Sequence, residues 1–274
     1  MVARITHLFH YPVKSCARLS VNSVVIDALG IAGDRRWMVV RADDGRFLSQ
    51  REYPGMAVIR PELTLDDLIL TAPGISDLAV SRHEHDLALR KATVWGFSGI
   101  AEDEGDVAAA WVTAALGVSC RLVRAGATWD RPVNPEFARP ADRVGFADGY
   151  PVLLSSAASL RDLNRRLSNP VPMERFRPNI VIDGDGLTAW AEDNWSRLQV
   201  VGSPLSFRVA KPCDRCGVIT VDQPTGERQG PEPLQTLASF RRDASGKILF
   251  AVNLIPDGGG AAPGLRVGDC LGAE

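Results

Sequence analysis

The chain has 274 residues, 45% of them hydrophobic, which suffices for two packed domains with a sizeable core. Its net charge of −2 offers no basic field for nucleic acid. The N-terminus lacks a signal-peptide pattern, no apolar run approaches the roughly 18 residues that span a bilayer, and the five cysteines are an odd number. We therefore expect a cytoplasmic protein with no membrane or nucleic-acid partner.

The first part of the chain is rich in predicted β-strands. Valine and isoleucine recur over residues 18–29, and residues 36–48 form a predicted hairpin around a turn that ends at Gly45. Further short apolar runs, separated by Pro, Gly and Asp, follow at residues 56–59, 63–70 and 87–95. Many short strands with turns between them indicate a small barrel or a strongly bent sheet.

Helices and loops become distinct after residue 105. Residues 106–116 are predicted to form the first helix, which Gly117 closes at its C-terminal end. Residues 124–142 are polar, contain three prolines and indicate an irregular connection. We place the domain boundary near this connection, with one domain at residues 1–122 and the other at residues 123–274.

The second half mixes both kinds of element. Apolar periodicity predicts helices over residues 157–167 and 233–241. Residues 180–182 are typical of a buried strand, and residues 218–222 also resemble a strand. Together with the first half, this pattern predicts an α+β fold that is rich in β-structure.

Cys213 and Cys216 form a Cys-x-x-Cys motif with several open interpretations. A structural zinc site needs four ligands, and the remaining cysteines and histidines are scattered. A redox dithiol normally opens a helix, whereas a strand is predicted after this motif. Two inert, buried cysteines are a further possibility. A last one is a single thiolate bound to a metal held mainly by a cofactor, and Arg215 favours it because a guanidinium stabilises a thiolate.

Several motifs together resemble the MOSC family. They run through nearly the whole chain and include Tyr11-Pro12-Val13-Lys14-Ser15-Cys16, Gly33-Asp34-Arg35-Arg36-Trp37, Phe176-Arg177-Pro178-Asn179 and Cys213-Asp214-Arg215-Cys216. The resemblance implies an N-terminal β-barrel-like domain packed on a MOSC β-barrel domain with peripheral helices. The chain is similar to the mitochondrial amidoxime-reducing component and its bacterial counterparts. This implies a molybdenum–molybdopterin cofactor and reduction of N-hydroxylated compounds such as hydroxylamines, amidoximes and N-hydroxylated bases.

The resemblance also implies roles for single residues. Cys216 matches the molybdenum ligand and is the expected catalytic residue, whereas Cys213 matches a neighbour that does not bind the metal. The positions that match cofactor contacts are Lys14, Ser15 and Arg35 at the phosphate, Arg177 and Asn179 at the pterin, Asp214 and Arg215 beside the ligand, and Gly149, Tyr150 and Asn253 at the mouth. The last three differ from the family residues, so we expect substrate preference to differ there.

The expected partners follow from the same resemblance. The sequence contains no plant-type iron–sulfur, flavin or nicotinamide motif. We therefore expect a separate ferredoxin- or cytochrome-type electron donor with its reductase, and a small N-hydroxylated substrate. The alternative is a molybdenum-cofactor carrier or sulfur-transfer module without reductase activity. A complete sulfurase would also need a pyridoxal-phosphate domain, of which this chain shows no sign.

Overall fold

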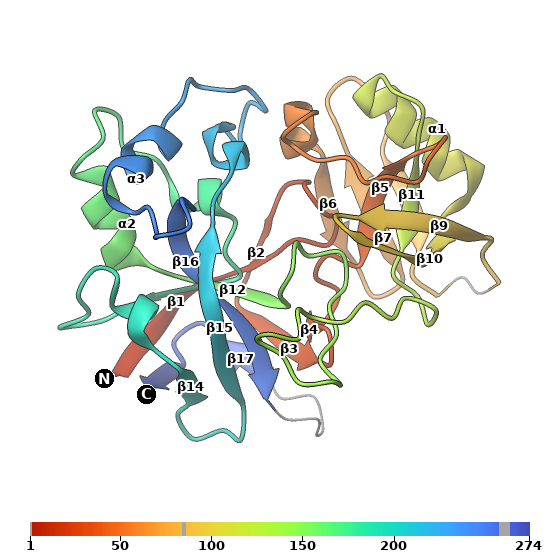
Figure 1. Cartoon of the computed structure of the whole chain (residues 1–274). Helices are drawn as coiled ribbons and strands as arrows, with labels where there is room; N and C mark the ends of the chain where they lie inside the picture. The colour runs from red at the N-terminus through yellow and green to blue at the C-terminus, as the bar shows by residue number, and fades with distance from the viewer. Residues whose placement is uncertain (1, 84–85, 258–263) are drawn as a thin grey trace.

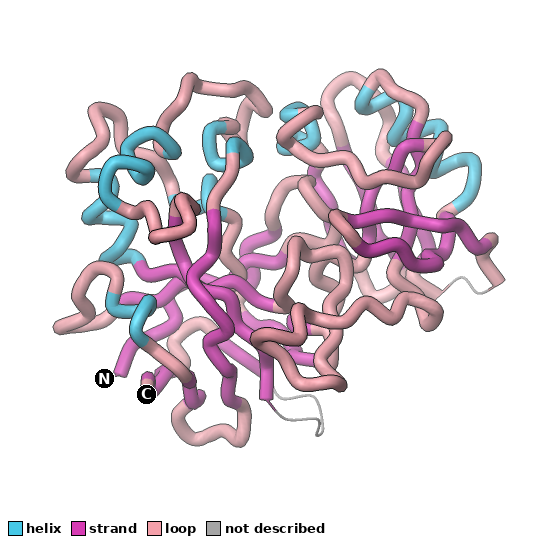
Figure 2. The backbone as a smooth tube through the Cα atoms, in the orientation of Figure 1, coloured by secondary structure: helices cyan, strands magenta, loops and turns pink. Residues whose placement is uncertain are grey.

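The computed structural model describes residues 2–83, 86–257 and 264–274. Figure 1 shows two lobes side by side, with both chain ends on the lobe that holds β1, β12, β15 and β16. Strands form the inner part of both lobes, and the helices lie mainly at the outside (Figure 2). This architecture confirms the predicted β-rich α+β fold class.

The first lobe is built on a closed barrel of seven strands. The strands follow the order β13-β12-β16-β15-β14-β18-β1, and pairing of β13 with β1 closes the ring, which leaves no long edge unpaired. β2 (Leu19–Val21) extends the sheet beside β1. The barrel strands are β1 (Val2–His10), β12 (Val152–Ser156), β13 (Ile180–Asp183), β14 (Arg197–Val200), β15 (Ser206–Asp214), β16 (Leu249–Asp257) and β18 (Cys270–Ala273).

The barrel interior is apolar because strands send alternate side chains inward. Ile5, Leu154 and Phe207 are among the fully buried side chains of this core. A small sheet joins the same core and consists of β3 (Ser23–Asp27), β4 (Gly30–Ile31) and β17 (Gly264–Arg266). The helical elements outside the barrel are α2 (Ala157–Asn164), α3 (Leu234–Phe240) and the 3-10 helices η2 (Met173–Phe176), η3 (Ala191–Asn194) and η4 (Gly217–Thr220).

The second lobe contains two small sheets with the orders β5-β11-β10-β9 and β6-β7-β8. The helix α1 (Gly105–Leu116) and the 3-10 helix η1 (Pro54–Val58) complete it. Its strands are β5 (Trp37–Arg41), β6 (Arg60–Leu63), β7 (Asp67–Thr71), β8 (Leu78–Ser81), β9 (Leu89–Val94), β10 (Phe97–Asp103) and β11 (Cys120–Arg124).

Three segments lie at the boundary between the lobes. Residues 11–18 leave β1 and run beside residues 32–37, since Arg35 N donates to Tyr11 O over 2.7 Å and Lys14 N donates to Trp37 O over 2.8 Å. The third segment is the irregular connection over residues 125–151, as its prolines predicted. Because β1 belongs to a barrel whose other strands all follow residue 151, the division into residues 1–122 and 123–274 stays a prediction.

Most predicted elements are present, but two predicted strands, one in each half of the chain, are wrong. The hairpin forms through a bridge between Val40 and Phe47, and α1 ends at Gly117 with a left-handed φ of 68°. Residues 56–59 instead fall largely in η1, and residues 218–222 largely in η4. Short buried apolar runs do not distinguish a strand from a helical turn. Cys216 therefore precedes a 3-10 turn, which removes the strand-based argument against a dithiol.

Candidate functional site

Lys14 is a buried cation at the boundary between the lobes. Its side chain is 6% exposed, its Nζ pairs with Asp148 Oδ1, and it lies 5.1 Å from the centroid of the Phe47 ring. Burial lowers the pKa of Lys14, and the carboxylate of Asp148 opposes that shift. A lysine held in this way can bind an anionic group without first losing a wide solvent shell.

Arg131 is a second buried cation beside Lys14, and no sequence motif marked it. Its guanidinium donates to the carbonyl oxygens of Ala147 and Asp148, each over 2.6 Å, and to that of Gly145 over 3.3 Å. Burial lowers the pKa of Arg131 to about 10. Its position in an arginine-rich irregular connection gave no signal that would separate it from surface arginines.

Ser15, Arg35 and Arg177 share an unusual backbone conformation. Their φ angles are 67°, 46° and 56°, in the left-handed region that few residues other than glycine adopt. Such conformations are unfavourable and cluster at functional sites. Gln50 Nε2 donates to Ser15 O over 2.7 Å and thereby ties the lysine segment to the second lobe.

Two of these residues enclose the ring of Tyr11. The guanidinium carbons of Arg35 and Arg177 lie 4.1 Å and 4.4 Å from the ring centroid, which is a cation–π arrangement. Arg177 also donates to Cys16 O over 2.8 Å and to Gln223 Oε1 over 3.1 Å. Burial raises the pKa of Tyr11 to about 12, so the phenol stays neutral. The arrangement fixes both arginines at the boundary.

Asn179 is fully engaged within the protein. Its Oδ1 accepts from Arg35 Nη1 over 2.9 Å and from Leu153 N over 3.1 Å, while its Nδ2 donates to Phe9 O and to Asp34 Oδ1. The side chain is 1% exposed. In this structure Asn179 therefore orients Arg35, and its direct contact with a pterin stays a prediction.

The cysteine motif lies where β15 ends. β-Bulges interrupt the pairing of β15 with β16 just before it, and Pro212 lies between the two irregular points. Cys213 is partly buried and its Sγ accepts from Arg215 Nη1 over 3.1 Å, while Arg215 Nη2 donates to Phe176 O over 2.8 Å. The predicted guanidinium beside a thiol is present, but it contacts Cys213 rather than Cys216.

Cys216 is exposed and immediately precedes η4. A series of contacts runs from here across the boundary: Arg228 donates to Gly217 O over 3.4 Å and to Arg51 O over 2.5 Å. Arg51 stacks on Trp95, whose Nε1 donates to Asp148 Oδ1 over 3.2 Å. The exposed thiol and the buried lysine are thus linked through both lobes.

The remaining predicted residues are Gly149, Tyr150, Asp214 and Asn253. Burial raises the pKa of Tyr150 to about 12, and the charges of Asp214 and Cys213 contribute to the rise, which places this phenol near the cysteine motif. Asn253 in β16 is paired with Lys211 and donates to its carbonyl over 3.4 Å. Asp214 is exposed, and Gly149 directly follows Asp148. Tyr150, Asp214 and Asn253 therefore lie near Cys213, and Gly149 directly precedes Tyr150 in the chain.

Comparisons with known proteins show the family of this chain. The MOSC N-terminal beta barrel domain matches residues 2–119, and the MOSC domain matches residues 141–271. Mitochondrial amidoxime reducing component 2 of Bos taurus is 34% identical over 259 residues, which cover 91% of this chain and 76% of that protein. The chain belongs to the MOSC family. Mitochondrial amidoxime-reducing component 1 of Homo sapiens is also 34% identical, over 91% of this chain and 75% of that protein.

A longer protein is also similar to this chain. Molybdenum cofactor sulfurase of Oryza sativa subsp. japonica is 32% identical over 265 residues, which cover 89% of this chain but 31% of that protein. In this MOSC protein, no helix in the described ranges is long and apolar enough to cross a membrane. Nor do three or more His, Cys, Asp or Glu side chains form a metal-binding group among the residues described.

The charges at the boundary of this MOSC protein fit an anionic cofactor. Lys14, Arg35, Arg131 and Arg177 gather there, opposed by the carboxylates of Asp34 and Asp148. Within the described part of the chain, Arg131 and Arg177 hydrogen-bond only to neutral oxygens. Buried Tyr150 Oη and Arg215 Nε have no partner there either. Excess cations and unpaired polar atoms are what a bound phosphate-bearing heterocycle would satisfy.

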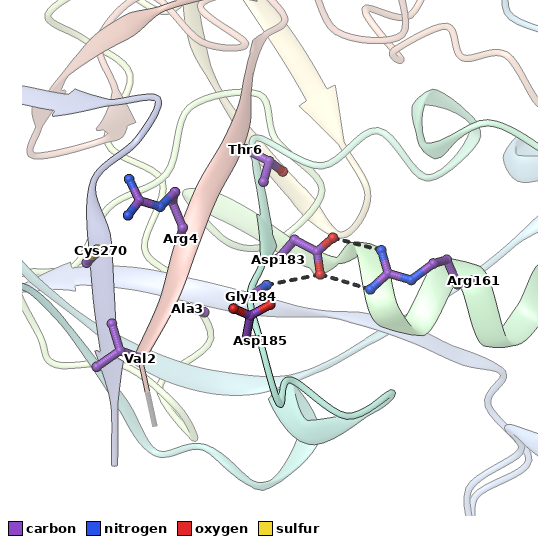
Figure 3. Close-up of a pocket in the computed structure, with 9 residues that line it drawn as sticks. All are labelled: Val2, Ala3, Arg4, Thr6, Arg161, Asp183, Gly184, Asp185 and Cys270. Carbon is purple, nitrogen blue, oxygen red and sulfur yellow. Dashed lines mark hydrogen bonds and ion pairs between the residues drawn. The ribbon is translucent and has the colours of Figure 1, made fainter.

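Not every hollow belongs to this site. A groove of about 690 Å³ lies beside β1, β13 and β18 (Figure 3), and none of the predicted site residues lines it. Its lining includes a bidentate ion pair between Arg161 and Asp183. A smaller hollow of about 290 Å³ lies between the lobes and includes Tyr11 and Gln223 in its wall. Because Gln223 also accepts a hydrogen bond from Arg177, this hollow lies next to the contacts of Arg177.

Proposed function

We propose that this protein is a molybdenum-cofactor-dependent reductase of N-hydroxylated compounds, with Cys216 as the thiolate ligand of the metal. The proposal is supported by an exposed cysteine connected to a group of buried cations at a boundary between two lobes. Family membership and similarity to amidoxime-reducing components add to it. The bound cofactor would supply the two-electron chemistry that cleaves an N–O bond.

Some residues of the chain would bind the cofactor, and others would line the opening through which the substrate enters. Lys14 and Arg35 would hold the phosphate as charge-assisted hydrogen-bond donors, with Ser15 beside them. Arg177, held against Tyr11, would keep the pterin end fixed, and Asn179 would orient Arg35. Arg215 would hold the motif through Cys213 and Phe176. Gly149, Tyr150, Asp214 and Asn253 would line the opening where a substrate enters.

The test uses two serine variants of one motif. The protein is purified from a host that makes molybdopterin, molybdenum is measured by elemental analysis, and reduction of an aryl amidoxime by a chemical reductant is followed. We expect Cys216→Ser to lose at least about tenfold in both molybdenum content and turnover, because a ligand atom is removed. Cys213→Ser is the matched control and should retain most of both.

Three other outcomes would favour the alternative function or contradict the proposal. Molybdenum bound without reduction of any N-hydroxylated compound would favour a cofactor carrier or sulfur-transfer module. Equal losses in both variants would show that Cys216 has no special role, and no molybdenum in the wild-type protein would contradict the proposal altogether. The physiological electron donor would be a separate ferredoxin- or cytochrome-type protein with its reductase.

A further inference from the structure

The ion pair between Lys14 and Asp148 joins two side chains that differ greatly in exposure. The lysine side chain is 6% exposed, whereas that of the aspartate is 76% exposed. A buried ammonium group needs an anionic or strongly accepting partner, while an exposed carboxylate is readily hydrated. Asp148 is therefore the member of the pair that can leave.

The backbone of Asp148 is held independently of its side chain. Arg131, which is 7% exposed, donates to the carbonyl oxygens of Ala147 and Asp148, each over 2.6 Å. Rotation of the carboxylate toward solvent would leave these bonds intact. The charges of Arg131 and Arg35 also act on Lys14, so the position opposite the lysine lies in a field of three cations. A dianion suits that field better than a single carboxylate.

Trp95 connects this ion pair to the surface. Its Nε1 donates to Asp148 Oδ1 over 3.2 Å. The centroids of the Trp95 and Phe47 rings lie 5.1 Å apart, and the guanidinium carbon of Arg51 lies 4.1 Å from the Trp95 ring centroid. The residue is 44% exposed and has a φ of 55°, which is rare for a bulky side chain. If the carboxylate leaves, the indole N–H loses its acceptor.

We propose that Asp148 is a displaceable counterion that reserves Lys14 for a phosphate group. Without a ligand, its carboxylate neutralises the lysine. A phosphate dianion takes its place, and the carboxylate turns to solvent and releases the indole of Trp95. The inference rests on the proposed function only in naming a phosphate ester as the physiological anion. Asp148 would act through Lys14 and set the affinity of the protein for that phosphate.

The test uses cofactor-free protein from a host that cannot make molybdopterin. Inorganic phosphate is titrated at constant ionic strength and followed by calorimetry and tryptophan fluorescence. We expect Asp148→Asn to bind phosphate about tenfold more tightly, because the competing carboxylate charge is gone, and linked binding events typically alter one another by about 5–150-fold. Phosphate should change the fluorescence of the wild-type protein, and this change should be absent in Trp95→Phe.

Asp130→Asn is the matched control. Asp130 belongs to the same irregular connection, its side chain is also 76% exposed, and it pairs with Arg143. The variant removes the same charge from the chain without touching Lys14. Its affinity for phosphate should equal that of the wild-type protein, which separates local displacement from a change in net charge.

Two results would overturn the inference. One is equal or weaker phosphate binding by Asp148→Asn in a variant that unfolds like the wild-type protein. The other is an identical phosphate-dependent signal in Trp95→Phe, which decides the matter even if Asp148→Asn does not fold. Phosphate behaviour as expected in a protein that never binds molybdenum would instead contradict the proposed function alone.

Discussion

At the scale of single residues, buried charges outside the site also govern how the protein responds to pH. Glu192 in η3 is fully buried, and its Oε1 accepts from Ser159 Oγ over 2.7 Å. Its Oε2 has no partner among the described residues. Burial raises the pKa of Glu192 above its ordinary value of 4.5, despite the opposing hydrogen bond from Ser159.

This carboxyl group predicts a specific pH dependence of stability. A raised pKa means that the folded chain binds the proton more tightly than the unfolded chain, so stability falls as the pH rises through the folded pKa. Glu192→Gln removes that loss. We expect the difference in free energy of unfolding between variant and wild type to grow in favour of the variant from pH 4.5 to pH 8, measured by urea denaturation.

The exposed Glu62 provides the control for this measurement, since Glu62→Gln removes a carboxylate of the same chemistry from β6. Its difference from the wild type should stay nearly constant over the same pH range. If the difference in free energy of unfolding were also constant for Glu192→Gln, other interactions in the folded protein would offset the effect of burying this carboxyl group.

The sequence predicted the types of residue at the candidate site better than their partners. Lys14, Arg35 and Arg177 lie at the lobe boundary, and their roles toward a cofactor stay predictions. The contact of Arg215 with Cys213 depends on side-chain orientation, which a sequence motif does not encode. The same holds for Asn179, whose amide hydrogen-bonds entirely within the protein. Arg131 and Trp95 were missed because their roles arise only where the connection and a hairpin turn meet Asp148.

At the scale of elements, the hairpin that begins with β5 depends on the glycine in its turn. Gly45 has a φ of 70°, and a Cβ atom there would lie 2.3 Å from the carbonyl oxygen of Lys91. The turn thereby packs directly on β9, and Thr93 N donates to Gly45 O over 2.8 Å. Only a residue without a side chain permits this approach.

Two alanine variants separate conformation from contact. Gly74 has a φ of 81° but no atom within 4 Å of its Cβ position, so Gly74→Ala should lower the free energy of unfolding by about 1–2 kcal/mol. Gly45→Ala should lower it by about 1–3 kcal/mol more, because the backbone of β9 must also move. Urea denaturation measures both. Equal losses would mean that the turn relaxes without disturbing β9.

Elements with strong local signals were predictable and those without were not. The continuous apolar run of β5 with its glycine turn, and the apolar residues of α1 with Gly117, specify their structures locally. The runs that became η1 and η4 are too short for their periodicity to decide between strand and helical turn. η1 also begins with a proline, which suits a first helical turn and is disfavoured inside a sheet.

At the scale of the whole molecule, the two halves of the chain are not independent bodies. β1 pairs with β13 and β18, so residues 123–274 alone would leave both of those strands with an unpaired edge. We expect the fragment of residues 123–274 to show no cooperative thermal transition by circular dichroism. Refolding it together with residues 1–122 should restore one.

A cleavage experiment controls for the break in the chain itself. Residues 134–136 of the irregular connection are exposed, so limited proteolysis there should yield two fragments that still elute together. Their association would show that loss of β1, rather than loss of chain continuity, unfolds the isolated fragment. A cooperative transition of residues 123–274 alone would instead support the predicted boundary as a true domain boundary.

The barrel's topology has a consequence for how the protein is made. A ribosome releases β1 long before it synthesises β13 and β18, two of its partners in the barrel. β2 can pair early with residues 8–10, but the edge that faces β13 and the part of the other edge that faces β18 stay unpaired through most of translation. Exposed strand edges invite mispairing. Slow translation or a crowded polysome should for that reason favour aggregation of this protein more than of one whose sheets pair locally.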